Sequence, residues 1–261
     1  MGRHSRFSNI ISNADNYKHT HYAMYPDGTE YVSSYIESRG GEFPATLFVG
    51  LQAFLREYLM HPITLADIED AEFVTREQGV HFNRKNWLDL LNDHDGYLPI
   101  AIEAVPEGTV VPTRNVLVQM VNTDPKYYWV TSFFETALLR GVWYPTTVGT
   151  VSWMCKQILR YALNRTSDHP EMLRKYLHDY GARGVSSQQS AALGGLAHLV
   201  NFDQRAVRGR AGGQGRSPQP NPASQDPAFA GWGLALSESE DERSEKRSVH
   251  PGRLLPRDGL Y

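Results

Sequence analysis

The chain has 261 residues, 41% hydrophobic and 21% charged, and its 26 Lys and Arg against 29 Asp and Glu give a formal net charge of −3. This profile is typical of a soluble globular protein and provides no overall basic field, which argues against wholesale nucleic-acid binding. No apolar run approaches the roughly 18–20 residues of a membrane helix and the polar start lacks a secretory signal, so we expect a cytoplasmic protein without a membrane span.

The first informative segment is residues 15–22, which read Asp15-Asn16-Tyr17-Lys18-His19-Thr20-His21-Tyr22. Tyr17 could stack on a flat heteroaromatic ring, Asp15 could accept from an amide or hydroxyl, and Lys18 could meet a phosphate. A polar strand with amphipathic tyrosines explains the same composition and is favoured on this segment alone. His19 and His21 could share a face and bind metal, but no third ligand is visible, so we expect surface histidines.

Local signals then predict a helix followed by strands. Thr64 and Asp67 have the spacing of a capping box, and the apolar residues after them recur at helical spacing, which predicts a helix over about residues 64–78. Beyond the turn signal Asp95-Gly96, residues 98–105, 109–111 and 116–120 are rich in β-branched side chains. We expect these to be short strands of one sheet.

Longer apolar segments follow the turn Asn122-Thr123-Asp124-Pro125. Residues 127–142 and 147–163 are long enough for two helices, and Trp143-Tyr144-Pro145 between them predicts a break. These helices would cover the sheet, so residues 1–202 are expected to form an alternating α/β domain.

The second informative segment is residues 177–189. Ser186 and Gln189 have capping-box spacing at the start of a predicted helix that reaches Val200. Free backbone amides at that helix start, together with the guanidinium group of Arg183, are suited to bind phosphate or pyrophosphate. An ordinary strand-turn-helix corner with a surface arginine explains the same spacing equally well.

Other candidate residues are weaker. Glu103 and Glu107 are close in sequence, but general acid–base catalysis by a carboxylate pair requires that the two side chains lie close together in space. Cys155 is the single cysteine, which excludes an internal disulfide framework and a thiolate metal cage. It lies in a helical pattern, so we expect a small buried residue rather than a nucleophile.

Composition changes sharply after Phe202. Of the 59 residues from 203 to 261, 32 are Arg, Gly, Pro, Ser or Gln, and only ten are large and apolar. Such a segment cannot bury enough apolar surface to offset its ordering entropy, so we expect residues 203–261 to be disordered. The abruptness of the change also suggests a reading frame entered by a frameshift.

Several ordered motifs resemble the nicotinamide phosphoribosyltransferase family from about residue 7 to residue 202. They are Asp15 through Tyr22, Tyr25-Pro26, Ala104-Val105-Pro106-Glu107-Gly108, Asn122-Thr123-Asp124-Pro125, Trp143-Tyr144-Pro145, and Leu177-His178-Asp179-Tyr180-Gly181 through Arg183-Gly184-Val185-Ser186-Ser187-Gln188.

The resemblance implies a reaction of NAD salvage. In it, nicotinamide attacks the anomeric carbon of phosphoribosyl pyrophosphate to give nicotinamide mononucleotide and pyrophosphate. The resemblance also implies assistance by Mg²⁺, coupling to ATP hydrolysis and a homodimer. Positive charge on the ribose and negative charge on the leaving group would require cationic stabilisation.

The resemblance assigns roles to five residues. Arg183 matches the family arginine at the phosphate or pyrophosphate, and Arg39 looks like a second arginine near the phosphates. Tyr180 stands where the family usually has Phe, on one side of the nicotinamide ring. Tyr17 matches the other side, which in the family comes from the second subunit, and Asp15 accompanies it there. No catalytic residue and no metal ligand is assigned.

The implied fold is an N-terminal α/β domain and the beginning of an atypical α/β barrel of the type II phosphoribosyltransferase kind. After the family-like residues 198–202 this chain reads Asp203-Gln204-Arg205-Ala206 instead of Gly-Thr-Asp. The family's C-terminal half, with its catalytic histidine, has no counterpart, so we expect an inactive chain in isolation. The alternative function is a silent fragment that acts only as a dimerisation or binding module.

Overall fold

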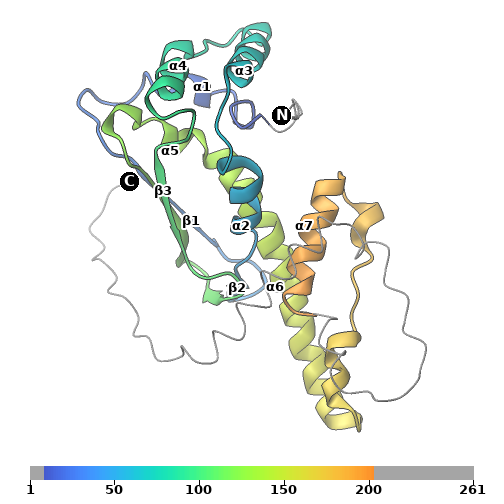
Figure 1. The fold of residues 1–261 in the computed structure, drawn as a ribbon. Helices are drawn as coiled ribbons and strands as arrows, with labels where there is room; N and C mark the ends of the chain where they lie inside the picture. The colour runs from blue at the N-terminus through green and yellow to red at the C-terminus, as the bar shows by residue number, and fades with distance from the viewer. Residues whose placement is uncertain (1–8, 203–261) are drawn as a thin grey trace. The chain divides into compact units, whose positions relative to one another are not determined.

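The computed structural model describes residues 9–202, which lie in a unit that spans Met1–Val207 (Figure 1). The predicted disorder of residues 203–261 concerns residues outside this range. Helices and strands alternate through the described part, which confirms the expected mixed α/β class. The beginning of a barrel stays a prediction.

The elements follow one another from short N-terminal pieces to long C-terminal helices. In chain order they are α1 (Lys18–His21), β1 (Ser33–Glu37), β2 (Ala45–Leu47), α2 (Leu51–Phe54), η2 (Leu55–Leu59), α3 (Leu65–Glu77), α4 (Arg84–Asp93), β3 (Ile100–Ala104), β4 (Val110–Pro112), β5 (Val116–Asn122), η3 (Pro125–Tyr127), α5 (Val130–Phe133), α6 (Glu135–Thr166), η4 (Pro170–Lys175), η5 (Gly181–Gly184) and α7 (Gln188–Leu199).

The strands form two antiparallel sheets. β5 lies between β1 and β3, with Tyr35 opposite Gln119 and Ile102 opposite Met120. β4 instead pairs with β2, where Val111 lies opposite Thr46. The prediction of one sheet was therefore right for β3 and β5 and wrong for β4, because β4 finds its partner more than 60 residues upstream.

Helix α3 confirms the predicted capping box. The Thr64 side chain accepts from the Asp67 amide at 3.3 Å, and the Asp67 carboxylate accepts from the Thr64 amide at 2.9 Å. Two amides that lack partners within the helix are thus satisfied.

The main core is aromatic. Trp87 of α4 packs edge-on against Trp129 and Phe133, with ring centroids 4.7 and 5.0 Å apart. All three rings are almost fully buried. Offset and edge contacts of this kind are favourable because the ring edges are positive and the faces negative. The core fixes α4 and α5 against the chain segment that carries α1.

Helix α6 runs through Pro145 without ending, so the predicted break at Trp143-Tyr144-Pro145 was wrong. The carbonyl four residues earlier belongs to Gly141, whose missing side chain admits Phe54: a Cβ there would lie 2.7 Å from that ring. Pro145 is buried against Gly50, which has φ +114°. These tertiary contacts offset a helix penalty of about 3 kcal/mol for an interior proline.

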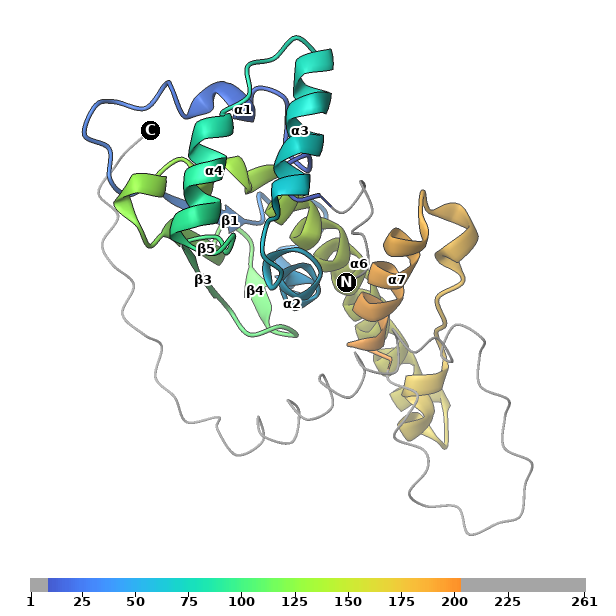
Figure 2. The same ribbon diagram turned by 45° about the horizontal axis from the view of Figure 1, so that its top comes forward.

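Two threonines fasten the strand that precedes α2 to α6. The Thr150 hydroxyl accepts from the Leu47 amide at 2.9 Å, and the Thr146 hydroxyl donates to the Val49 carbonyl at 3.0 Å. The C-terminal end of α7 packs on the same part of α6, as Figures 1 and 2 show. α6 is therefore a scaffold to which β2, α2, η4 and α7 attach. Within residues 9–202, no helix combines the length and apolar run needed to cross a bilayer.

Candidate functional site

Asp15 and Tyr17 lie together at the start of α1. The segment is a helical turn, not the polar strand favoured from sequence, since the Lys18 amide bonds the Asp15 carbonyl at 2.9 Å. The Asp15 carboxylate accepts from the Tyr17 hydroxyl at 3.2 Å and from the Thr136 hydroxyl of α6 at 2.6 Å. The Tyr17 ring remains 55% exposed. An aromatic face and an acceptor are thus offered side by side.

Lys18 is already paired within the chain, and its ammonium lies 5.4 Å from the centroid of the Tyr17 ring. Its side chain is 5% exposed, and its ammonium forms an ion pair with Glu135 at 2.5 Å. A buried cation of this kind needs its partner, because desolvation of a lone charge is costly. Lys18 thus fastens α1 to the first turn of α6, and the phosphate role considered from sequence is not supported.

His19 is buried, so the expectation of surface histidines was wrong for this residue. Its ring lies 5.3 Å from Phe133 and 5.9 Å from Phe82, and burial among these groups lowers its pKa from 6.5. His21 is half-buried and packs on Tyr17. Over residues 9–202, no three His, Cys, Asp or Glu side chains are grouped as metal ligands.

Tyr180 and Arg183 lie before α7. Tyr180 is 84% exposed and touches His178 edge-on at 6.2 Å, and Arg183 is an exposed residue of η5. The helix start differs by one residue from prediction, since Ser187 and not Ser186 is the cap and accepts from the Ser190 amide at 3.1 Å. Ser186 reaches only the Ser190 hydroxyl. The segment presents a ring and a cation to solvent.

The structure does not bring the five candidate residues into one site. Arg39 is exposed just beyond β1. Figures 1 and 2 place α1 and η5 in different parts of the described unit, with η5 the short turn just before α7. Asp15 and Tyr17 therefore form one exposed cluster. Tyr180 and Arg183, at the start of η5 and within it, form a second.

Other polar residues have structural roles. Glu107 is buried, and its carboxylate accepts from the Gly50 and Gln52 amides at 3.1 and 2.8 Å, which caps α2. Glu103 is exposed on β3, so the two carboxylates do not form an acid-base pair. Cys155 is half-buried in α6, where we had expected a buried residue.

His198 opens the family-like residues 198–202 but was not among the candidate site residues. It is buried in α7, its Nδ1 lies 2.8 Å from the Ser152 hydroxyl, and its Nε2 lies 3.2 Å from the Leu177 carbonyl. Burial is the first cause that lowers its pKa from 6.5. An apolar helical pattern gives no signal for these contacts, because the partners are 46 and 21 residues away.

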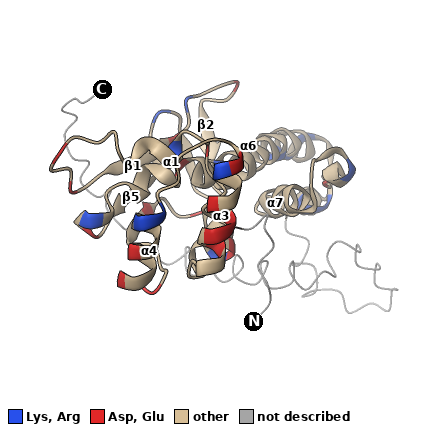
Figure 3. Cartoon of the chain, turned by 90° about the horizontal axis from the view of Figure 1, so that it is seen from above, with Lys and Arg blue, Asp and Glu red and all other residues tan. Residues whose placement is uncertain are grey.

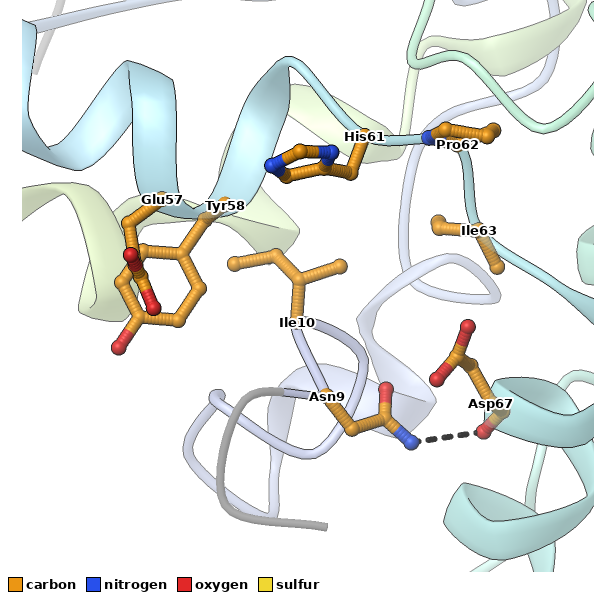
Figure 4. A pocket seen from close by; sticks show the side chains of 8 residues that line it. All are labelled: Asn9, Ile10, Glu57, Tyr58, His61, Pro62, Ile63 and Asp67. Atoms are coloured by element: carbon orange, nitrogen blue, oxygen red, sulfur yellow. Dashed lines mark hydrogen bonds between the residues drawn. The ribbon is translucent and has the colours of Figure 1, made fainter. Parts of the chain in front are cut away.

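A small pocket lies elsewhere, between the N-terminal segment and the end of η2 (Figure 4). Its volume is about 120 Å³, and its wall includes a hydrogen bond of 2.8 Å from Asn9 to the Asp67 carbonyl. Binding pockets for drug-sized ligands are usually about 300–1,000 Å³. None of the five candidate residues lines it.

Helix α3 is strongly acidic. It carries five acidic residues and one arginine, and Figure 3 shows the acidic positions in red along it. An acidic helix repels a phosphate backbone.

Comparison with known proteins identifies the chain's relatives. Residues 9–102, which include Asp15 and Tyr17, match the family model described as nicotinamide phosphoribosyltransferase, N-terminal domain. A nicotinamide phosphoribosyltransferase of Xanthomonas campestris pv. campestris (strain 8004) is 55% identical over 195 residues. Residues 9–102 therefore match the N-terminal domain of the nicotinamide phosphoribosyltransferase family.

More distant family members give the same match. A nicotinamide phosphoribosyltransferase of Acinetobacter baylyi is 28% identical over 217 residues. For both bacterial relatives the match covers 74% of this chain and 42% of the relative, so the chain spans less than half of their length. A crystal structure of human nicotinic acid phosphoribosyltransferase is similar with a TM-score of 0.47 at 19% identity, over 72% of this chain and 35% of that one.

Proposed function

We propose that this chain provides the N-terminal part of a pentosyltransferase that forms nicotinamide mononucleotide and pyrophosphate from nicotinamide and phosphoribosyl pyrophosphate in NAD salvage. The 55% identity to the Xanthomonas nicotinamide phosphoribosyltransferase is the observation that carries the proposal. We further propose that the protein acts in the cytoplasm.

The two exposed clusters have the chemistry that this reaction needs. Tyr17 and Tyr180 each present a ring able to stack on a flat pyridine base, and Asp15 can accept from its carboxamide. The exposed guanidinium of Arg183 suits the pyrophosphate group, which carries the developing negative charge, and Arg39 is a second cation for phosphate.

The base site is proposed to form between two copies of the chain. Within one copy, Tyr17 and Tyr180 belong to separate clusters, so a sandwich requires the second copy to supply one ring. In a symmetric dimer each copy would then contribute Asp15 and Tyr17 to one site and Tyr180 and Arg183 to the other. Exposed apolar residues on α6 favour association: Leu139, Trp143, Val151, Ile158 and Tyr161.

Turnover by this chain alone is proposed to be negligible. Losing one preorganised charge-stabilising donor can cost about 100- to 1,000-fold in rate, and neither exposed cluster contains a paired acid and base. Mg²⁺ and ATP remain expectations from the family. Within residues 9–202 no three His, Cys, Asp or Glu side chains are grouped as metal ligands, and no step is assigned to either.

The alternative is a silent module that retains dimerisation and base stacking without chemistry. The separation of the five candidate residues within one copy is the observation that favours this alternative. Incubation of the purified chain with nicotinamide and phosphoribosyl pyrophosphate, followed by measurement of mononucleotide and of base binding, separates the two. Mononucleotide formation by the chain alone would support the enzyme but contradict the negligible turnover proposed above. Base binding without product supports the module, and loss of both contradicts the proposed function.

A further inference from the structure

The segment that carries Tyr180 and Arg183 has a buried attachment at its beginning. Leu177 is half-buried, and its carbonyl lies 3.2 Å from Nε2 of His198, 21 residues later. The hydrogen bonds of Gly181 and Ser186 reach only two and four residues along the chain. The His198 contact therefore ties the segment to the body of the unit, whereas those of Gly181 and Ser186 shape it locally.

The geometry determines where the imidazole hydrogen lies. A carbonyl oxygen can only accept, so Nε2 of His198 carries the hydrogen and donates it to Leu177. Nδ1 is then an acceptor and receives the Ser152 hydroxyl of α6 at 2.8 Å. In this neutral form both ring nitrogens are satisfied, and the ring connects three parts of the chain: α6, α7 and the segment after η4.

Packing holds the ring in that orientation. The Phe202 ring stacks on His198 at 4.9 Å with an interplanar angle of 14°. Asn201 donates to the Gly149 carbonyl at 3.0 Å, which anchors the end of α7 beside the same turn of α6. Ser152 and His198 are both buried. The position of Leu177 is thus determined by α6 and α7 together.

We infer that His198 is a positioning residue for the segment of residues 177–187, which it holds against α6 so that Tyr180 and Arg183 are presented in one place. The assignment of a base-binding role to that segment rests on the proposed function. The attachment itself does not, because it is a property of the folded chain.

Protonation should release the attachment. An imidazolium would place a second hydrogen on Nδ1, where the Ser152 hydroxyl now donates, and would bring a charge into a buried site. The charged and titratable groups around the ring are Asp179 and His178 on the attached segment and Lys156 of α6, which lies over Phe202. Burial is the largest effect and opposes the imidazolium, as does His178, whereas the Leu177 carbonyl and Asp179 favour it. The net effect lowers the pKa of His198.

Amide hydrogen exchange of the purified chain tests the inference. Peptides covering residues 177–187 would be followed by mass spectrometry from about pH 7.5 to about pH 5.5, with correction for intrinsic rates. At the higher pH, His198→Ala should raise exchange in this segment about tenfold while peptides of α3 are unchanged. The wild type should show the same loss of protection in acid.

His198→Gln is the decisive variant. Its amide N–H can replace Nε2 toward Leu177 but does not titrate, so it should restore protection and remove the acid-induced step. His169→Gln, at an exposed histidine paired with Glu171, should behave as the wild type. Unchanged exchange in His198→Ala, or an acid step that persists in His198→Gln, would overturn the inference.

If His198→Ala also exposes α3, that variant has lost its fold, and the pH comparison of the wild type with His198→Gln decides alone. No readout here depends on product formation. A chain that makes no mononucleotide can therefore still support or overturn the role of His198.

Discussion

The hydroxyl of Thr136 donates to the carboxylate of Asp15 across 2.6 Å, although 121 residues separate the two in sequence. The same carboxylate oxygen accepts from the Tyr17 hydroxyl. The first turn of α6 thereby fixes both groups proposed to meet the base, and the adjacent Glu135 holds Lys18.

Thr136→Val should weaken nicotinamide binding about three- to tenfold, because it removes the donor that orients Asp15 and leaves Tyr17 less restrained. Thr136→Ser keeps the hydroxyl and should bind as the wild type. Isothermal calorimetry measures the affinity. Thr147→Val is the matched control, since the Thr147 hydroxyl bonds only within α6 to Trp143. Equal affinities of Thr136→Val and wild type would contradict the orienting role.

Glu107→Ala should lower the free energy of unfolding by about 1–3 kcal/mol, because the Gly50 and Gln52 amides at the start of α2 lose their acceptor. Urea denaturation measures the change. Glu103→Ala, at an exposed position of β3, should change stability little. A Glu107→Ala protein as stable as the wild type would show that another group caps α2.

Gly50→Ala should destabilise the fold by about 3 kcal/mol or more, because two penalties combine. Gly50 has φ +114°, and a Cβ there would lie 2.2 Å from Cγ of Pro145. Gly28→Ala is the control for backbone strain alone, since Gly28 has φ +81° with open space around it, and it should cost about 1–2 kcal/mol. Thermal unfolding of the two variants should therefore differ clearly, and similar melting temperatures would contradict the packing argument.

His19 should make stability depend on pH. Its folded pKa is depressed below 6.5 by burial, so its neutral form contributes fully above pH 6.5 and this contribution is lost as the pH falls through the folded pKa. His19→Leu should reduce the acid loss of unfolding free energy, and His198, whose pKa is also lowered, should contribute to the slope that remains. Denaturant titrations over this pH range measure it, with His169→Asn as the exposed control. An unchanged slope in His19→Leu would refute the assignment.

Local sequence signals correctly predicted the features that depend on residues close together in the chain. The capping box at Thr64 and Asp67 fixed the start of α3, and the helix expected toward Val200 is present as α7. The pairing of β4 with β2 and the passage of α6 through Pro145 depend on partners far along the chain, Thr46 and Gly50, which no window of sequence contains.

The residues of the candidate site divide in the same way, into those that the sequence identifies and those whose contacts form only on folding. The family resemblance found Asp15, Tyr17, Tyr180 and Arg183, whose side chains are exposed and carry recognisable chemistry. It could not find Thr136 or His198, because ordinary helical residues become orienting groups only when folding brings Asp15 and Leu177 against them.

Mixing two defective variants tests the central proposal, that the base site joins Tyr17 of one copy to Tyr180 of another. Tyr17→Ala and Tyr180→Ala should each abolish nicotinamide binding. After unfolding and refolding together in equal amounts, about one quarter of the sites should return, because half of the dimers are mixed and each mixed dimer has one intact site of two. No recovery on mixing, or binding by either variant alone, would contradict the proposal.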